Sequence, residues 1–394
     1  MTMPSITLKK HHDKRIKNGH GWVFSNEIFL IDGEAGPGDV IDALDSHGKF
    51  IGIGYYNPNS LIAFRLLSHE KVEINADFYS NRITHAVRHR EIFCKNAEAV
   101  RLVHSESDGL PGVTIDKIGN TVSIQIVCAG ADIHTDFIVD AIKKVVNPDY
   151  IILKNESGLR NFEGLPLFTK VVHGDENVPP TKFSEHEIQY EADVIDGQKT
   201  GFYIDQRENR LAFRRCISEN DVVLDAFCNE GGFALNASKA GAKRVVAIDN
   251  SESALDRAAQ NAKRNGLDKK IEFQKHDLMK WIPENADSQK FDVINLDPPS
   301  FAKNKKAAGN ALRGYLKLHT SALKMLQPGG YLSTATCSHH IDTDRFMQTV
   351  TDAASKLNKQ LTLVYRGSQP PDHPVHPSMP ETEYLRFFIF RLMP

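Results

Sequence analysis

The sequence predicts an α/β protein with a doubly wound, mostly parallel sheet in its C-terminal half. Strand-like and helix-like segments alternate from about residue 200, which is typical of parallel sheets covered by helices. Short β-prone runs with turns between them fill the first 75 residues, and strands and helices mix in the region that follows. We therefore expect a β-rich domain at 1–75, a small α+β domain at 76–190 and an α/β domain at 191–394.

The two N-terminal domains are predicted from short runs and turns. The runs DVIDALD, KFIGIGYY and LIAFRLL indicate strands of the β-rich domain, separated by the turns SHG and NPNS. A helical pattern covers about 75–98. Further on, VTIDKIGNTVSIQIV predicts a β-hairpin that turns at Gly119 and Asn120.

Five apolar segments of the C-terminal half predict strands: DVVLDAF, RVVAIDN, KIEFQKHD, FDVINLD and GGYLSTATC. The helical segment ESALDRAAQNAKRN has Ser251 as its expected N-cap and Gly266 as its expected C′ residue. The last two strands, LTLVYRG and YLRFFIFRL, are joined by a Pro-rich loop and not by a helix. The final strand is therefore expected to pair antiparallel, at or near an edge of the sheet.

Composition is that of an ordinary soluble protein, with 41% hydrophobic and 25% charged residues and a net charge of −2. No run of about 18 apolar residues occurs, so no membrane span is expected. The five cysteines are scattered and form no CxxC pair, which argues against disulfides and structural zinc and favours the reducing cytoplasm. Basic clusters such as LKKHHDKRIK are candidate contacts for nucleic acid.

Acidic residues follow successive predicted strands of the α/β domain. They are Asp225, Asp249, Asp277 and Asp297, one at the end of each of the first four strands. Because the carboxyl ends of parallel strands meet at one edge, the four carboxylates should lie together where such sheets bind ligands. The turn CNEGGF after Asp225 contains glycines that let the backbone approach a ligand closely.

These acids favour S-adenosylmethionine over NAD, the main rival. The turn is not GxGxxG, and acids would repel a pyrophosphate. Asp249 suits ribose hydroxyls, Asp277 suits an adenine amino group, and Asp225 suits the positive charges of the cofactor. To the same cofactor we assign Asp297 and the neighbouring residues Phe227, Cys228, Asn229, Gly231, Asn250, Ser251 and Leu278.

Several motifs occur in the order found in one known family: HGWVFSNEI (20–28), ESDGLPGVTID (106–116), KTGFYIDQRENR (199–210), FCNEGGF, DPPSF, TCS (336–338) and DHPV (372–375). Over nearly its whole length the sequence resembles the RlmI-type class I methyltransferases, bacterial enzymes that make 5-methylcytosine in large-subunit (23S) ribosomal RNA. The resemblance implies an RNA-binding PUA domain, a central domain and a Rossmann-like methyltransferase domain. It also implies cofactor contacts from Lys199, Tyr203 and Gln206. The sequence departs from many relatives at CNEGGF and CSHH.

Methylation at cytosine C5 requires a nucleophile, because C5 does not attack a sulfonium methyl directly, whereas a thiolate added at C6 makes it reactive. Cys337 ends a predicted strand near the cofactor, so we predict that it is this nucleophile. Cys228 is expected to pack beside the cofactor. Asp297 is predicted to hydrogen-bond cytosine N3 and to stabilise the charge that develops in the ring.

The two prolines of DPPSF end their strand and form a rigid turn that faces the ligand. Phe301 is expected either to stack on a flipped base or to pack under the loop. Some RNA cytosine-5 methyltransferases carry a second cysteine directly after the proline of this motif, where this chain has Ser300, so Asp297 and a water molecule both stay open as the base for the C5 proton. To the RNA substrate we assign Pro298, Pro299, Phe301 and His373.

Two alternatives to cytosine-5 methylation stay open. The DPP motif also suits methylation of an exocyclic amine of guanine or adenine, which needs no thiolate. The N-terminal domain would also suit a non-catalytic RNA-binding assembly factor. The expected partner is ribosomal RNA, without a membrane and without a metal, since His373 and His376 have no further ligand pair. A homodimer is compatible with the sequence.

Overall fold

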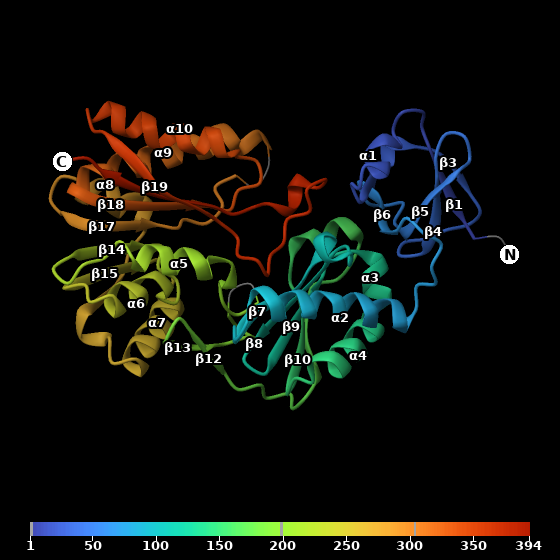
Figure 1. The fold of residues 1–394 in the computed structure, drawn as a ribbon, viewed down its shortest axis with the longest axis horizontal. Coiled ribbons are helices and arrows are strands. Elements are labelled where there is room, and N and C mark those ends of the chain that lie inside the picture. Colours follow the sequence, from blue (N-terminus) through green and yellow to red (C-terminus); the bar gives the residue numbers. More distant parts are fainter. Residues whose placement is uncertain (1–2, 198–199, 303–304) are drawn as a thin grey trace. The chain divides into compact units, whose positions relative to one another are not determined.

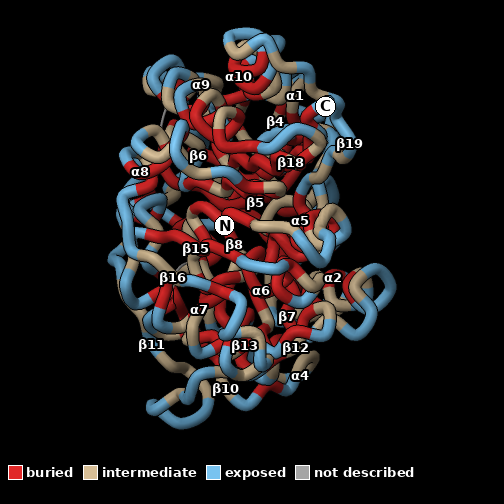
Figure 2. Tube along the Cα trace, turned by 90° about the vertical axis from the view of Figure 1, so that its left-hand side faces the viewer, coloured by how far each residue is buried: buried red, intermediate tan, exposed pale blue. Residues whose placement is uncertain are grey.

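The structure, a computed structural model, describes residues 3–197, 200–302 and 305–394. The chain divides into two compact units. The first unit contains Met1–Phe183, Ala192–Ile204 and Pro371–Thr382, and the second contains Ser184–Glu191, Asp205–Pro370 and Glu383–Pro394. Each unit is built from sheets with helices packed on them (Figure 1), and the strands are mostly buried while the connecting loops are exposed (Figure 2). Both units are therefore discontinuous in sequence.

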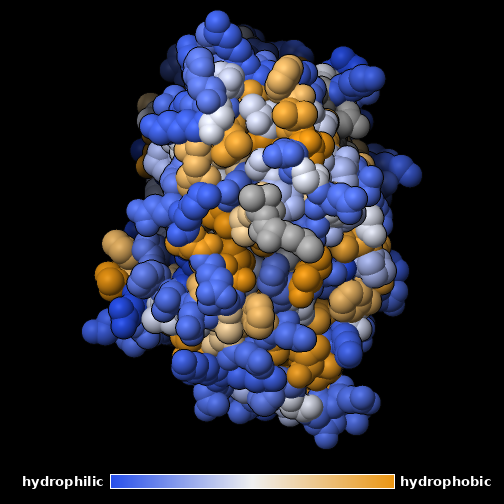
Figure 3. Space-filling model, turned by 90° about the vertical axis from the view of Figure 1, so that its right-hand side faces the viewer, coloured by the Kyte–Doolittle hydropathy of each residue, from blue (hydrophilic) through white to orange (hydrophobic). Residues whose placement is uncertain are grey.

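The N-terminal part of the first unit is a β-sheet with one short helix. Its elements are β1 (Ser5–Leu8), α1 (Lys14–Lys17), β2 (Trp22–Phe24), β3 (Ile28–Asp32), β4 (Val40–Leu44), β5 (Phe50–Tyr56) and β6 (Ile62–Ser68). The strand order is β2-β6-β5-β4-β1-β3. The three predicted runs are β4, β5 and β6, which confirms these strands. The edge strand β3 exposes Phe29, Leu30 and Ile31, and Figure 3 shows apolar groups among hydrophilic ones on one face of the molecule.

The central part of the first unit is a second sheet, ordered β11-β10-β9-β8-β7. Its elements are α2 (Ala76–Phe93), β7 (Ala99–His104), β8 (Val113–Ile118), β9 (Thr121–Ile126), α3 (Ala129–Ile133), α4 (Thr135–Val146), β10 (Tyr150–Asn155) and β11 (Phe168–His173). The predicted hairpin is confirmed, because β8 and β9 pair antiparallel with Ile118 opposite Thr121. Helices α2 and α4 cover the sheet with buried residues such as Ile83 and Ile138.

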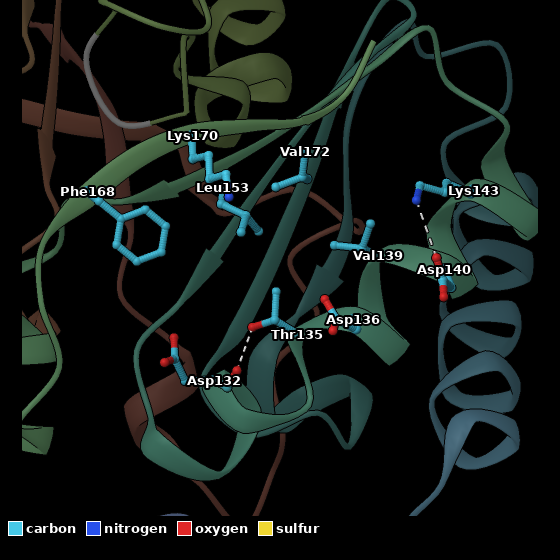
Figure 4. Close-up of a pocket in the computed structure, with 10 residues that line it drawn as sticks. All are labelled: Asp132, Thr135, Asp136, Val139, Asp140, Lys143, Leu153, Phe168, Lys170 and Val172. Carbon is cyan, nitrogen blue, oxygen red and sulfur yellow. Dashed lines mark hydrogen bonds and ion pairs between the residues drawn. The ribbon is translucent and has the colours of Figure 1, made fainter. Parts of the chain in front are cut away.

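The central sheet and α4 enclose a cavity of about 420 Å³ (Figure 4). Apolar side chains of the sheet, including Leu153 and Phe168, face acidic residues of the helical side. At one end Asp140 pairs with Lys143 at 3.3 Å. None of the residues assigned to the cofactor or the substrate lines this cavity, so the candidate site lies elsewhere.

The N-terminal and central sheets share an apolar core within the first unit. Tyr55 of β5 and Leu67 of β6 belong to the same cluster of buried side chains as Tyr79 of α2, and the Tyr55 and Tyr79 hydroxyls are hydrogen-bonded. Glu163, which ends a 3₁₀ helix at Gly158–Glu163 and is 6% exposed, accepts hydrogen bonds from Ser60 (2.7 Å) and Arg65 (3.2 Å). The division into three domains at 75/76 and 190/191 stays a prediction.

A hairpin of β12 (Thr181–Glu185) and β13 (Ile188–Ala192) leads into the second unit, whose sheet has the order β16-β15-β14-β17-β18-β20-β19. Its strands are β14 (Val222–Ala226), β15 (Arg244–Asp249), β16 (Ile271–Lys275), β17 (Phe291–Leu296), β18 (Leu326–Thr336), β19 (Leu361–Ser368) and β20 (Arg386–Leu392). The first five are parallel to one another, and β20 pairs antiparallel with both β18 and β19. The prediction that the last strand pairs antiparallel near an edge is therefore confirmed.

Helices cover both faces of this sheet. They are α5 (Arg207–Arg214), α6 (Gly232–Lys239), α7 (Glu252–Arg264), α8 (Leu278–Asn285), α9 (Ala308–Met325) and α10 (Thr343–Lys356). Helices α8, α9 and α10 lie on one face, and α5, α6 and α7 on the other (Figure 1). Helix α7 begins and ends as predicted: the Ser251 hydroxyl accepts from the Ala254 N–H, and Gly266 has a φ of 66°. The doubly wound α/β fold is thus confirmed.

No helix among the described residues has both the length and the apolar composition needed to cross a membrane.

Candidate active site

The four predicted acids lie at the carboxyl edge of the parallel strands in the second unit. Asp225 is the fourth residue of β14 and Asp249 is the last residue of β15. Asp297 directly follows β17, and Asp277 follows β16 after one further residue. The strand order reverses between the neighbours β14 and β17, which is where open α/β sheets bind ligands. The described acids therefore surround the expected binding position.

Asp225 supports the site through hydrogen bonds within the protein. Its side chain is fully buried, and its two oxygens accept hydrogen bonds from the Ala234 N–H (2.8 Å) and the Asn295 side chain (2.9 Å). The pKa of Asp225 is raised to about 7, chiefly by burial and further by the charges of Asp297 and Asp249, although these hydrogen bonds lower it. Asp225 thus fixes the start of α6, and Asn295 is a supporting residue that the sequence argument did not single out.

The loop between β14 and α6 has an unusual backbone. Phe227, Asn229 and Gly231 have φ values of 65°, 47° and 80°, a left-handed conformation that is costly for a bulky residue and is enriched at ligand sites. A Cβ on Gly231 would lie 3.1 Å from Leu235 Cδ1 and 3.2 Å from Ala258 Cβ. The loop therefore packs closely on α6 and α7, and a glycine is required at this position.

Asp249 holds this loop from the neighbouring strand. Its Oδ2 accepts from the Asn229 N–H at 2.9 Å, and its Oδ1 accepts from the Ser251 N–H at 2.9 Å. A carboxylate oxygen has a second lone pair, so both oxygens of Asp249 retain acceptor capacity for hydroxyl groups of a ligand. Asn250, which lies between Asp249 and Ser251 in the sequence, is exposed. The predicted pairing of Asp249 with a ribose thus suits its place in the structure.

Cys228 and Glu230 of the loop are both buried. Burial raises the pKa of the Cys228 thiol well above its ordinary value, with Asp225 and Asp249 adding to the effect. A thiol held neutral in this way is a poor nucleophile, which agrees with the packing role expected for it. Arg257 of α7 donates to Glu230 at 2.7 Å, a second contact that the sequence argument missed.

Asp277 and Leu278 begin α8. The Asp277 carboxylate caps the helix by accepting from the Met279 N–H at 3.1 Å, and the side chain is 56% exposed. Leu278 is buried in the core. Asp277 therefore combines an N-cap with a surface that a ligand can reach.

Asp297 is oriented by a chain of amide side chains. Gln206 donates to Asp297 Oδ2 at 3.0 Å, and Asn209 in turn donates to Gln206 Oε1 at 2.7 Å. Asn209 also donates to the backbone carbonyl of Ser368 at 3.2 Å. The structure thus brings Gln206 to the DPPSF motif and adds Asn209, a residue that the prediction had not included.

Two further residues of the KTGFYIDQRENR motif were assigned to the cofactor. Lys199 lies outside the described residues. Tyr203 is half-buried and belongs to the first unit. Their contacts with a cofactor stay predictions.

Cys337 directly follows β18 and is partly exposed. Strands β17 and β18 are parallel neighbours with Leu296 opposite Thr334, so the residues that follow them, Asp297 and Cys337, lie at the same edge. The hydroxyls of Ser300 and Ser338 lie 2.9 Å apart and join the two loops. The structure therefore places a partly exposed thiol beside the DPPSF motif.

The residues assigned to the substrate differ in their surroundings. Pro298 is buried and Pro299 is exposed. The Phe301 ring lies 4.7 Å from the ring of the fully buried Tyr315, which favours packing under the loop over stacking on a base. His373 belongs to the first unit, is 1% exposed, and its ring lies 5.4 Å from that of His104. Such burial is that of a structural residue, and a substrate contact of His373 stays a prediction.

The chemistry of the edge can be compared with the expected cofactor. The described loop from Phe227 to Gly231 contains an acid and no Lys or Arg, so it offers nothing to neutralise a phosphate. Carboxylates and backbone groups suit hydroxyl, amino and sulfonium groups instead. Across the described ranges, no group of three or more His, Cys, Asp or Glu is arranged to hold a metal ion. The residues present fit S-adenosylmethionine.

Comparisons with known proteins agree with this description. A PUA-like domain family matches residues 6–69, and a methyltransferase domain family matches residues 217–373. A methyltransferase crystallised with S-adenosylhomocysteine has the same fold, with a TM-score of 0.85 and 22% identity over 98% of this chain and 99% of that one. The ribosomal RNA large subunit methyltransferase I of Erwinia tasmaniensis is 37% identical over 98% of this chain and 99% of its own length. The protein of the same name from Vibrio parahaemolyticus is 37% identical over 99% of both. This chain belongs to the ribosomal RNA large subunit methyltransferase I family.

Proposed function

We propose that this protein transfers a methyl group from S-adenosylmethionine to C5 of a cytosine in large-subunit ribosomal RNA, through a covalent adduct with Cys337. The name of the relatives supports ribosomal RNA as the substrate. The observation that carries the choice of C5 is the partly exposed thiol of Cys337 at the strand end beside DPPSF. Cys228 at the same edge is buried with a raised pKa and does not compete.

Bound S-adenosylmethionine supplies an electrophilic methyl group. On the protein side, Asp249 accepts from the ribose hydroxyls, and the exposed Asp277 accepts from the adenine amino group. The loop from Phe227 to Gly231 holds the remainder of the molecule through backbone groups. Asp225 helps to hold this loop in place, because both of its oxygens accept hydrogen bonds within the protein.

Cys337 and Asp297 carry the chemistry on the base. The Cys337 thiolate adds to C6, so that an S–C6 bond forms and the C5–C6 π electrons become available at C5. Protonated Asp297, oriented by Gln206, donates to N3 as negative charge develops there. As the charge develops, Asp297 transfers its proton to N3 and becomes a carboxylate. After C5 is methylated, its proton leaves to this carboxylate or to water, and N3 releases its proton to solvent. The C6–S bond then breaks, its electron pair returns to sulfur, and the C5–C6 double bond is restored.

A mechanism-based trap tests this proposal. Ribosomal RNA transcripts that carry 5-fluorocytidine should form a covalent complex in the presence of S-adenosylmethionine, because fluorine cannot leave C5 as a cation. Cys337→Ala should abolish both the complex on a denaturing gel and the formation of 5-methylcytidine. Cys228→Ala should still form the complex, because its thiol is buried and neutral.

Two outcomes would contradict the mechanism. A complex that persists in Cys337→Ala and disappears in Cys228→Ala would reverse the roles of the two cysteines. Retained methylation by Cys337→Ala without any complex would point to an exocyclic amine of a purine as the acceptor. A protein that binds the RNA but no S-adenosylmethionine would instead be the non-catalytic assembly factor.

A further inference from the structure

A pair of hydroxyls joins the two loops that carry the proposed catalytic residues. Ser300 follows the two prolines of the Asp297 loop, and Ser338 follows Cys337. Their Oγ atoms lie 2.9 Å apart. Ser338 is fully buried and Ser300 is half-buried. The Ser300–Ser338 pair is therefore a protected hydrogen bond that bridges the edge of the sheet.

The residue on the other side of Cys337 is also held. Thr336 is fully buried, and its Oγ1 accepts both from the Tyr315 hydroxyl at 2.9 Å and from the Ser338 N–H at 3.2 Å. Cys337 thus lies between two residues whose side chains are fixed. The Ser338 N–H bond to Thr336 spans Cys337 and holds the backbone on both sides of it.

Tyr315 of α9 is itself rigidly placed. Its side chain is fully buried, with the Phe301 ring at 4.7 Å and the Phe346 ring perpendicular to it at 5.0 Å. Burial raises the pKa of Tyr315 to about 12, so the phenol keeps its proton and remains a donor. The ring that fixes Thr336 is the same one on which Phe301 of the DPPSF motif packs.

We propose that Tyr315, Ser300 and Ser338 are positioning residues that set the distance between the Cys337 thiol and the Asp297 carboxylate. This inference rests on the proposed function. Sulfur must reach C6 while Asp297 engages N3 of the same ring, so the planar base demands one fixed separation of the two groups. A misplacement of about 1 Å can cost roughly 100-fold in rate. A hydrogen bond between the two loops supplies this constraint directly.

The rate of adduct formation measures the positioning. In single-turnover reactions with 5-fluorocytidine RNA, Ser300→Ala and Ser338→Ala should each slow the adduct roughly 10- to 100-fold. The double variant should be no slower than the worse single variant, because both changes remove the same hydrogen bond. Tyr315→Phe keeps the ring and should also slow the adduct. The affinity for S-adenosylmethionine, measured by calorimetry, should stay within about twofold, since none of these hydroxyls contacts the Asp249 edge.

Two matched variants separate positioning from loss of structure. Ser300→Thr keeps a hydroxyl and should restore most of the adduct rate, which a purely structural defect would not predict. Ser288→Ala removes a serine hydroxyl from an exposed position of the second unit and should leave both readouts unchanged. If Ser338→Ala fails to fold, the partly exposed Ser300 variants still decide the question.

The outcomes distinguish this inference from the function on which it rests. A wild-type adduct that depends on Cys337, together with normal rates in Ser300→Ala and Ser338→Ala, would overturn the positioning role and leave the function intact. Equal losses of adduct rate and cofactor affinity, or no rescue by Ser300→Thr, would also overturn it. Absence of any adduct in the wild-type protein would refute the proposed function, and the positioning role with it.

Discussion

The acids at the sheet edge are all aspartates but have different environments. Asp225 is buried and bound on both oxygens, Asp249 accepts from two backbone N–H groups, and Asp277 is largely exposed. Their common position could be predicted from the sequence, because each follows an apolar run. Their environments could not, because Asn295, which binds Asp225, reaches it only through the pairing of β14 with the distant strand β17.

Asp249 should dominate cofactor affinity. We expect Asp249→Ala to weaken S-adenosylmethionine binding by roughly 10- to 150-fold, which corresponds to the loss of hydrogen bonds from a charged group, about 1.5–3 kcal/mol. Titration calorimetry measures this directly. Glu272→Ala is the matched control, since Glu272 pairs with Arg244 at the surface of the neighbouring strand β16. Equal affinities of the two variants would remove Asp249 from the cofactor site.

His319 should make the second unit sensitive to acid. The side chain is fully buried between the hydroxyls of Thr334 (2.9 Å) and Thr349 (3.1 Å), and burial lowers its pKa from 6.5 to about 3. Between these two pH values the unfolded chain binds a proton that the folded chain does not. The folded state therefore loses up to about 1.4 kcal/mol per pH unit as the pH falls through this window.

The variant His319→Gln removes this titration and keeps polar contact with the threonines. Its absolute stability is expected to be lower, so the informative quantity is the change in Tm between pH 7.5 and pH 5.0. We expect a larger fall in wild type than in the variant. Parallel falls would show that His319 is not the acid-sensitive group.

At the scale of elements, the long strands and helix α7 follow from local patterns, whereas other parts do not. The strand runs at 222–226 and 291–296 are mostly apolar, and α7 carries its own cap at Ser251. The hairpin β12–β13 and helix α5 lack such signals. They are held by contacts between them, because Glu185 of the hairpin binds Arg210 of α5 through two hydrogen bonds of 2.7 Å.

This ion pair is buried on both sides, each side chain being 3% exposed. Glu185→Ala removes the carboxylate that pairs with a buried guanidinium, so it should lower the free energy of unfolding by about 3–5 kcal/mol. The double variant Glu185→Leu/Arg210→Met should lose less free energy of unfolding than Glu185→Leu or Arg210→Met alone. The Cδ atom of Arg210 also lies 3.0 Å from the position that a Cβ on Gly232 would occupy. Glu185→Ala should therefore weaken cofactor binding as well. Denaturant unfolding of the double variant and of its two single variants checks this order of stabilities. Additive losses of the two single changes would contradict it.

At the scale of the whole molecule, the structure divides into two compact units, and the division into three domains stays a prediction. In the sequence, a change from β-prone runs to a helical pattern separates the N-terminal part from the central part. Within the first unit they are joined by a shared apolar core and by contacts such as Glu163 with Arg65, which no local pattern reveals. Equally, the DHPV loop joins the first unit because Asp372 accepts from the Arg101 N–H at 2.9 Å, across 271 residues of sequence.

The basic segment around α1 is the candidate RNA contact of the first unit. Arg15 within it donates to Glu27 at 2.9 Å and to the Trp22 carbonyl at 3.1 Å, so it has a structural role. Lys10 and Lys14 are exposed. A truncation at residue 75 would remove the Ser60 and Arg65 partners of the buried Glu163, and point variants of the exposed lysines are therefore the sharper test.

We expect Lys10→Glu/Lys14→Glu to weaken RNA binding and to flatten its salt dependence, because fewer counterions are released when fewer phosphates are neutralised. Filter binding across a salt series gives the slope. Lys269→Glu/Lys280→Glu changes the same charge at exposed positions of the second unit and serves as the control. If both double variants had the same slope as wild type, α1 would not be an RNA contact.

The return of Pro371–Thr382 to the first unit has a consequence for the order of synthesis. The residues up to Phe183 are synthesised before the segment Pro371–Thr382, so the unit that they form lacks the buried Asp372 and His373 until that segment has been made. The sheet of the second unit likewise waits for β20, which inserts between β18 and β19. Neither unit can therefore finish folding before its late segment has been made, and any chain released before then exposes two incomplete cores at once, which would direct it to chaperones and proteases.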